Sequence, residues 1–361
     1  MSGPDASLVA AIRAKETQPN DWPRQTLMLL VSLAIFFAVG LIWWDVRLVL
    51  ILVSILLVHE AGHCIAMIAF GYRNIRLVFL PMFGAAVSGH QVQLATWKKA
   101  IVYFAGPLPG IVISMGLLMV ATAGNSDTNA SVTAVPILMM NSSRPWLFEL
   151  GGLGLLLNWM NLLPLLPLDG GKIVQATFTR PSPWREVTGR VLTVAAITGL
   201  GILIGEPLLL LLVIPLLFTI PLTYRTSWLC GQLNNQEIEQ PNGQQIPESA
   251  IETIASAIDE TALRALSAPQ KASLVLQLYE TLIAPSPSKF ARPAIWLVYI
   301  GSITASTLFG WWIWTLHRWH DSGAVELGMS ANMVTGGRFD KGSQAALSAV
   351  TGLLESGWLT L

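Results

Sequence analysis

The segment LVLILVSILLVHEAGHCIAMIAF, residues Leu48–Phe70, decides the fold expected for this chain. It is long enough to cross a bilayer, because a helix of about 20 mostly apolar residues spans the hydrocarbon core. Yet it carries three ionisable side chains, His59, Glu60 and His63, among aliphatic neighbours. Such groups cost about 2.5–3.5 kcal/mol each inside a spanning helix, so they usually mark a functional site.

The composition places this segment in a membrane protein. The chain has 361 residues, of which 53% are hydrophobic and 12% charged. Soluble domains carry about 25% charged residues, so the low charge predicts several spanning helices and the lipid bilayer as a partner. The formal net charge is +0, so no global field attracts nucleic acid, and we expect no nucleic-acid partner.

The apolar runs predict an all-α polytopic membrane protein with about six to seven spanning helices. The expected spans are Thr26–Trp44, Leu48–Phe70, Lys99–Ala123, Trp146–Leu166, Val187–Ile204, Pro207–Tyr224 and Pro293–Leu316. Between the second and third spans, Ile75–Gly89 is rich in β-branched and aromatic residues and is interrupted by Pro81 and Gly84. This pattern predicts a short β-hairpin or a re-entrant segment.

Polar stretches divide the chain further. The N-terminal segment is polar for too long to be a signal peptide, so insertion is expected to depend on the first span. Two amphipathic helices are expected in the polar insertion, at about Pro247–Leu266 and Pro269–Ile283. Lys and Arg near the spans place the N-terminus and this insertion in the cytoplasm. The predicted divisions are 1–25 (polar segment), 26–224 (membrane region), 225–292 (cytoplasmic helical insertion), 293–316 (last span) and 317–361 (tail).

The spacing of His59 and His63 indicates a metal site. Residues four apart lie one above the other on a helix, so both imidazoles can reach one ion. Glu60 lies one step round the helix, where it can transfer protons. The pattern H-E-x-x-H is typical of zinc hydrolases, which combine two ligands with a general base. The alternative is a pair of histidines that bond neighbouring helices, with Glu60 as a polar clamp.

Asp169, in NLLPLLPLDGGK, is the expected third ligand. A catalytic zinc usually has three protein ligands and one open position. Pro164 and Pro167 cannot continue a regular helix, and Gly170 and Gly171 permit a sharp turn. Broken backbone at membrane depth is tolerated where it is buried in protein or lines a cavity, so Asp169 can turn inward. The alternative is an ordinary turn that ends a helix.

The two motifs together resemble those of the site-2 proteases, a family of intramembrane zinc metalloproteases. The resemblance is carried by HEAGH on an early span and by the stretch from Asn161 to Gly170 on a later one, and it covers about 48–175. It implies a three-helix catalytic core over that range. Family members often have a Gly-Pro motif followed by Asn at the third core helix. Here Gly106-Pro107-Leu108-Pro109-Gly110 has Gly at that place.

The resemblance also implies roles for individual residues. One zinc ion per chain would be held by His59, His63 and Asp169, with Glu60 activating water. Asn161 would hold substrate or the developing oxyanion, although an interhelical hydrogen bond would equally explain an Asn there.

The predicted function is that of an intramembrane zinc endopeptidase. It would hydrolyse peptide bonds in or near transmembrane segments of membrane proteins, as in regulated intramembrane proteolysis. The expected location of the enzyme is a bacterial inner membrane. A spanning substrate helix must unwind first, and Ile75–Gly89 is the expected edge for an added substrate strand. The alternatives are a plain structural hairpin and, for the whole chain, a non-proteolytic membrane scaffold or partner-binding protein that retains the metal site. A metal transporter is a third alternative. It would need ligands along the whole path across the membrane, whereas the candidate ligands here are expected at one depth.

Overall fold

The computed structural model describes residues 6–17, 21–80, 84–91, 94–122, 145–178, 182–204, 207–241, 245–285 and 288–335. The chain forms two compact units, Met1–Leu308 and Phe309–Leu361, and each is described by itself. The first contains every element that bears on the site. Of the second, the structure describes the helix that continues to Thr335.

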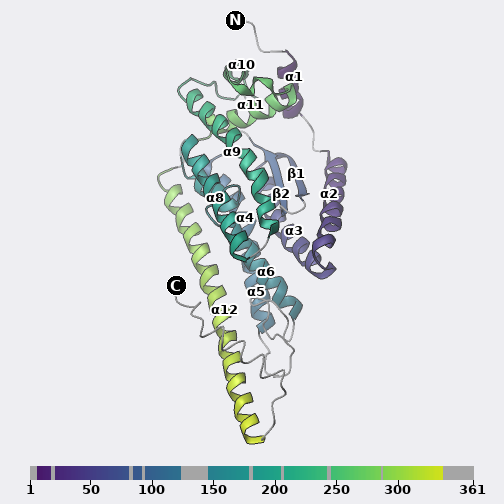
Figure 1. The fold of residues 1–361 in the computed structure, drawn as a ribbon. Coiled ribbons are helices and arrows are strands. Elements are labelled where there is room, and N and C mark those ends of the chain that lie inside the picture. Colours follow the sequence, from purple (N-terminus) through teal and green to yellow (C-terminus); the bar gives the residue numbers. More distant parts are fainter. Residues whose placement is uncertain are drawn as a thin grey trace. The chain divides into compact units, whose positions relative to one another are not determined.

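Most of the described residues are helical (Figure 1). The elements are α1 (Ala6–Thr17), α2 (Trp22–Trp43), α3 (Val46–Ala69), β1 (Arg73–Leu80), β2 (Gly84–His90), α4 (Thr96–Ala105), α5 (Pro107–Thr122), α6 (Pro145–Asn161), α7 (Asp169–Ala176), α8 (Pro183–Ile204), α9 (Pro207–Leu233), α10 (Glu248–Asp259), the 3-10 helix η1 (Ala262–Ala265), α11 (Ala268–Leu282) and α12 (Ala291–Thr335).

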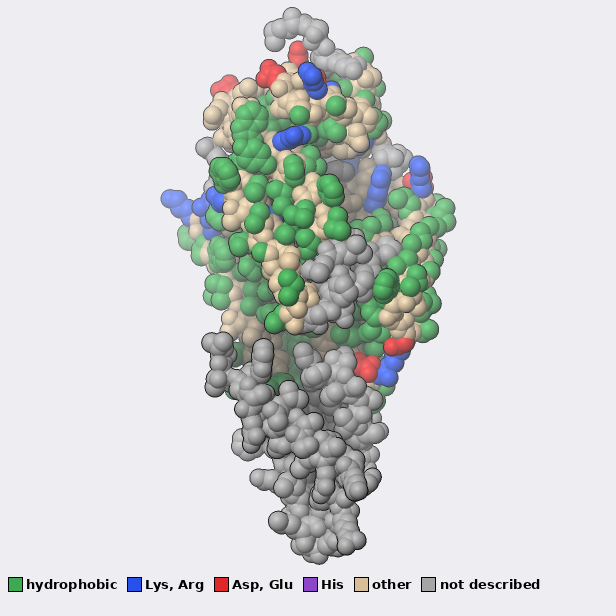
Figure 2. Space-filling model, in the orientation of Figure 1, with side chains coloured by type: hydrophobic (Ala, Val, Ile, Leu, Met, Phe, Trp, Pro, Cys, Tyr) green, Lys and Arg blue, Asp and Glu red, His purple; other side chains and the backbone are tan. Residues whose placement is uncertain are grey.

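Five segments of the described chain are helical, long and apolar enough to cross a membrane. They are Trp22–Trp43, Val46–Ala69, Thr96–Thr122, Pro183–Leu203 and Ala291–Thr315. Helices α6 and α9 lie at the other two predicted spans. Hydrophobic side chains cover much of the described surface in Figure 2, as expected for contact with lipid. The chain is an integral membrane protein.

The predicted hairpin is confirmed. Strands β1 and β2 pair antiparallel, with Leu77 opposite Val87 and Leu80 opposite Gly84. Gly84 has φ +94°, a conformation that glycine adopts without steric cost. Helix α2 packs along β1, where Phe36 contacts Phe79 edge to face at 5.6 Å between ring centroids.

The N-terminal helix α1 packs against the polar insertion, an arrangement that the sequence analysis did not predict. Leu8 and Ile12 of α1 join a buried apolar cluster with the end of α9, α10, η1 and α11. These five elements are called the helical unit below, and Figure 1 shows α10 and α11 beside α1. The predicted insertion helices are both present, although η1 replaces the last turns of the first.

Three predicted spans end at other residues in the structure. Helix α9 continues past the predicted end at Tyr224 to Leu233. Helix α6 ends at Asn161 rather than at Leu166, because the chain turns before Pro164. Helix α12 continues past the predicted end at Leu316 to Thr335. The rest of the predicted tail, after Thr335, lies outside the described residues.

Candidate metal centre

Helix α3 brings His59, Glu60 and His63 to its buried side. Their exposed fractions are 4%, 5% and 4%. Two glycines clear the space around them. A Cβ on Gly62 would lie 1.8 Å from the Ala105 carbonyl oxygen, and a Cβ on Gly106 would lie 2.3 Å from His63 Nε2. Only glycine therefore lets the junction between α4 and α5 lie this close to the histidines.

Asp169 is the first residue of α7 rather than part of a turn that ends a helix. After α6 the chain turns through Leu162–Leu168, with a cis peptide bond between Leu166 and Pro167. Gly170 and Gly171 were predicted to form a sharp turn. This prediction is wrong, because both residues are helical. A Cβ on Gly170 would lie 2.1 Å from the Leu162 carbonyl oxygen, so the glycines allow α7 to begin directly against the turn.

The structure brings the three predicted ligands together. Asp169 Oδ2 lies 3.1 Å from His59 Nε2 and 3.0 Å from His63 Nε2. The two Nε2 atoms are 3.2 Å apart. Asp169 is 5% exposed, so the whole cluster is buried. Ligands held 2.0–2.1 Å from a tetrahedral zinc ion lie about 3.3 Å apart, close to the observed spacing.

Hydrogen bonds on the far side of each imidazole determine which nitrogen faces inward. His63 Nδ1–H donates to the Val102 carbonyl oxygen at 2.7 Å. His59 Nδ1–H donates to Asn158 Oδ1 at 2.8 Å, and Asn158 Nδ2 in turn donates to the Gly154 carbonyl oxygen at 2.7 Å. A neutral imidazole with its proton on Nδ1 presents a lone pair at Nε2.

Three electron-rich atoms thus converge in a buried space. Two Nε2 lone pairs and a carboxylate oxygen repel one another unless a cation lies between them. Two imidazole nitrogens with one carboxylate oxygen form a ligand set of catalytic zinc sites, and partners that orient the histidines are usual there. The residues present therefore fit a zinc ion.

The other oxygen of Asp169 is held by Lys172. Lys172 Nζ lies 3.1 Å from Asp169 Oδ1, one turn along α7. The same ammonium group lies 5.8 Å from the centre of the Tyr103 ring. Asp169 is thereby oriented with Oδ1 toward Lys172 and Oδ2 toward the histidines.

The two asparagines of α6 lie differently. Asn161, which the sequence analysis selected, is half-buried, and no described hydrogen bond joins it to His59, His63 or Asp169. Asn158, one turn earlier, is 1% exposed and bonds His59 directly. Asn158 was not predicted from the sequence, although a second amide in a mostly apolar helix is a signal that could have indicated it.

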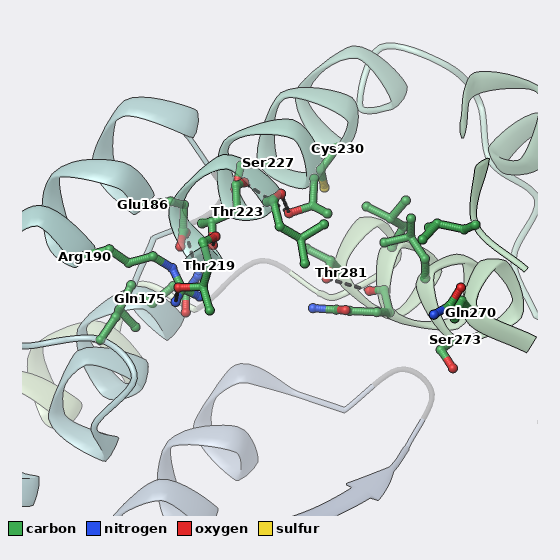
Figure 3. A pocket seen from close by; sticks show the side chains of 17 residues that line it. Gln175, Glu186, Arg190, Thr219, Thr223, Ser227, Cys230, Gln270, Ser273 and Thr281 are labelled. Carbon is green, nitrogen blue, oxygen red and sulfur yellow. Dashed lines mark hydrogen bonds between the residues drawn. The ribbon is translucent and has the colours of Figure 1, made fainter. Parts of the chain in front are cut away.

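Two cavities lie near α7 without being lined by the three candidate ligands. One of about 410 Å³ has Tyr103 and Lys172 in its wall, so it approaches the Lys172 side of Asp169. The other, of about 600 Å³, lies between α8, α9 and α11 (Figure 3). In its wall, Arg190 donates to Thr219 at 2.8 Å and Gln175 donates to Glu186 at 2.5 Å. The candidate site is identified by its converging side chains.

Known proteins are similar to the part of this chain that contains the candidate site. Residues 47–205 match the model of peptidase family M50. A zinc metalloprotease of Methanocaldococcus jannaschii is 29% identical over 154 residues, which cover 43% of this chain and 40% of that protein. Stage IV sporulation protein FB of Bacillus subtilis is 31% identical over 153 residues, covering 42% of this chain and 47% of that protein.

A solved structure, the site-2 protease from Methanocaldococcus jannaschii, aligns with a TM-score of 0.39 and 19% identity, covering 55% of this chain and 88% of that chain. The match with each of the two curated relatives spans less than half of that relative's length. The matched region includes His59, Glu60, His63 and Asp169. Residues 47–205 of this chain therefore form a domain of peptidase family M50, the family of the site-2 proteases.

Proposed function

We propose that this chain is an intramembrane zinc endopeptidase that hydrolyses peptide bonds in or near transmembrane segments of other membrane proteins. The observation that carries the proposal is the buried cluster of His59, His63 and Asp169, whose ligand atoms lie 3.0–3.2 Å apart. The peptidase M50 domain over residues 47–205 supports it independently. We propose one zinc ion per chain, because the described residues contain one cluster of three such ligands.

The reaction needs a base beside the metal. A zinc ion, when bound, would polarise the scissile carbonyl and lower the pKa of water. Glu60 is buried and directly follows His59 on α3. In the proposed mechanism its carboxylate takes a proton from the attacking water and gives it to the leaving amine as the peptide bond breaks.

Asn161 is proposed to donate a hydrogen bond to the scissile carbonyl oxygen, where negative charge develops. It is the last residue of α6, so its side chain is placed where the regular helix stops. Its half-buried state leaves the amide accessible to a ligand. A preorganised donor of this kind is worth about 10²–10³ in kcat.

The hairpin is proposed to hold the unwound substrate by strand addition. The freed backbone of an unwound helix needs hydrogen-bond partners within the membrane. On β1, the Phe79 N–H already donates to Ser32 Oγ of α2 at 3.1 Å. Strand β2 begins near α3, since a Cβ on Gly84 would lie 3.5 Å from Leu56 Cδ2, and Leu56 is one turn before Glu60. An added strand is therefore expected at β2.

The test is cleavage of a panel of single-span reporter helices by the purified full chain in liposomes. Metal content is measured on the same samples, with Glu60→Gln as the matched variant. We expect cleavage by the native chain and a loss of about 10²–10⁴ in rate for Glu60→Gln, with zinc retained. The bacterial inner membrane is the proposed location, and lipids of that composition are used.

Two results would contradict the proposal. Product formation unchanged by Glu60→Gln would exclude the mechanism. Bound zinc with no cleavage of any reporter, including helices destabilised by Gly and Pro, would favour the membrane scaffold that retains the metal site.

A further inference from the structure

We infer that Asn158 is a positioning residue of the metal centre. Gly110 on α5 has no side chain and so leaves the space in which the Asn158 amide reaches His59. The inference rests on the proposed zinc site and adds a residue to it. Asn158 touches no reacting atom. Its role is to hold the His59 ring so that Nε2, and not Nδ1, faces Asp169.

The contacts of Asn158 allow one arrangement of its amide. Nδ2 donates to the Gly154 carbonyl oxygen, one turn earlier on α6, at 2.7 Å. Because that carbonyl can only accept, Oδ1 is the atom that faces His59 Nδ1 at 2.8 Å. The imidazole must then carry its proton on Nδ1. Asn158 is 1% exposed, so water does not compete for these bonds.

The two histidines are therefore oriented by different means. The ring of His63 is held by a backbone carbonyl, that of Val102, which no side-chain substitution removes. The ring of His59 is held by a side chain from a helix 99 residues further along the chain. The orientation of His59 is thus sensitive to a single substitution on α6, while that of His63 is not.

Gly110 of α5 lies directly against the Asn158 amide. A Cβ on Gly110 would lie 2.3 Å from Asn158 Oδ1 and 2.5 Å from both Asn158 Cγ and Nδ2. These three atoms are the nearest neighbours of that position, so the Asn158 amide occupies the volume that a side chain at residue 110 would fill. A side chain at one of the two positions excludes the amide at the other.

This exclusion predicts that the amide can be moved from α6 to α5. Asn158→Ala removes the acceptor from His59 Nδ1. Gly110→Asn alone places two side chains in one volume. Gly110→Asn with Asn158→Ala supplies an amide from the other helix into the space that Asn158 left. Alanine at residue 158 keeps the helix propensity of α6.

The experiment measures zinc affinity of the full chain in detergent by competition with a chelator, together with the absorption spectrum of the cobalt-substituted protein. The forms compared are native, Asn158→Ala, Gly110→Asn, the double variant and Asn161→Ala. Loss of an orienting partner typically lowers metal affinity by about 10–100-fold. We expect that loss for Asn158→Ala, recovery to within about 3-fold of native in the double variant, and native affinity for Asn161→Ala.

The outcomes separate this inference from the proposed function. A native chain that binds no zinc contradicts the proposed site itself. Native zinc binding with an unchanged affinity and cobalt spectrum in Asn158→Ala overturns the positioning role alone. If Asn158→Ala fails to fold, the zinc affinity of the double variant still tests the inference. Folding with native affinity supports the exchange, and folding without recovered affinity overturns it.

Discussion

The candidate metal centre and the helical unit are built with opposite polarity. Around α3 the polar residues His59, Glu60 and His63 are buried, while large apolar residues of the same helix such as Ile65 and Ile68 are 68% and 58% exposed. In the helical unit the buried cluster consists of hydrophobic side chains such as Ile251 and Ile254, whereas Glu248 and Asp259 of the same helix are exposed. At the end of the face in Figure 2 where α1, α10 and α11 lie, acidic side chains are visible.

The difference shows what drives each region together. Burial of apolar side chains away from water stabilises the helical unit. Within a bilayer that driving force between helices is absent, so close packing at small residues and polar contacts take its place. Gly62 and Gly106 supply the close approach, and the Asn158 and Lys172 contacts supply the polar bonds. A substitution in one region should therefore leave the other region unaffected.

The largest expected effect is that of Asp169→Asn. The variant keeps the shape of the side chain but loses the charge that faces both Nε2 atoms. Zinc affinity should fall by about 1,000-fold, since zinc sites bind with about 10–16 kcal/mol shared among a few ligands. Chelator competition measures the affinity, and proteolysis of the helical unit serves as the control. A native affinity would remove Asp169 from the ligand set.

Ile254→Ala should affect the other region alone. Ile254 is fully buried in α10, and truncation leaves a cavity in the apolar cluster. The helical unit should lose about 3 kcal/mol of stability. Hydrogen exchange in α10 and α11 reports the loss, and exposed Ser256→Ala on the same helix is the matched control. Zinc binding that fell along with the helical unit would show that the two regions do not separate.

Gly106→Ala tests the close approach at the metal centre. The added Cβ would lie 2.3 Å from His63 Nε2 and 2.8 Å from His59 Nε2, so it displaces both rings. Zinc affinity should fall by about 10–100-fold, the range found when ligand orientation is lost. Gly116→Ala, in the following helix with nothing within 4 Å of its Cβ, should keep native affinity. Equal behaviour of the two variants would contradict the packing argument.

The smallest expected effects come from two tyrosines that perform the same task in the two regions. Tyr279 donates to the Glu239 carbonyl oxygen at 3.0 Å, and Tyr299 donates to the Leu162 carbonyl oxygen at 2.7 Å. Burial raises the pKa of Tyr279 to about 12, so its hydroxyl remains a donor at neutral pH. Each Tyr→Phe change should lower the stability of its region by about 1 kcal/mol, because one hydrogen bond is lost.

The location of that loss distinguishes the two tyrosine variants. Tyr279→Phe should speed hydrogen exchange in the helical unit only. Tyr299→Phe releases the turn that leads to Asp169, so exchange should rise between Asn161 and Asp169. The same exchange pattern from both variants would show that the regions are coupled.

The sequence predicted the cluster of His59, His63 and Asp169 because its geometry is local or strongly marked. Four residues of helix determine how His59 and His63 face one another. Asp169 was marked by the prolines and glycines around it. Asn158 was missed because its role depends on the rotation of α6 relative to α3, and a single amide in a mostly apolar helix does not show which neighbouring helix it faces.

The partners of the helical unit were hidden for a related reason. The amphipathic patterns of α10 and α11 predicted two helices, but not what their apolar faces contact. Ile12 of α1 and Tyr279 of α11 lie in one cluster although more than 260 residues separate them. The close packing at Gly170 was likewise assigned to a turn, since a glycine in the sequence does not distinguish unusual backbone angles from close approach.

The most direct test of the account is X-ray absorption at the zinc edge on the purified full chain, with total zinc measured in parallel. We expect about one zinc per chain, bound by two imidazole nitrogens and oxygen at about 2.0–2.1 Å, with no sulfur ligand. His63→Ala should leave one imidazole and much less zinc. A folded native chain without zinc, or a zinc spectrum unchanged by His63→Ala, would contradict the metal centre described here.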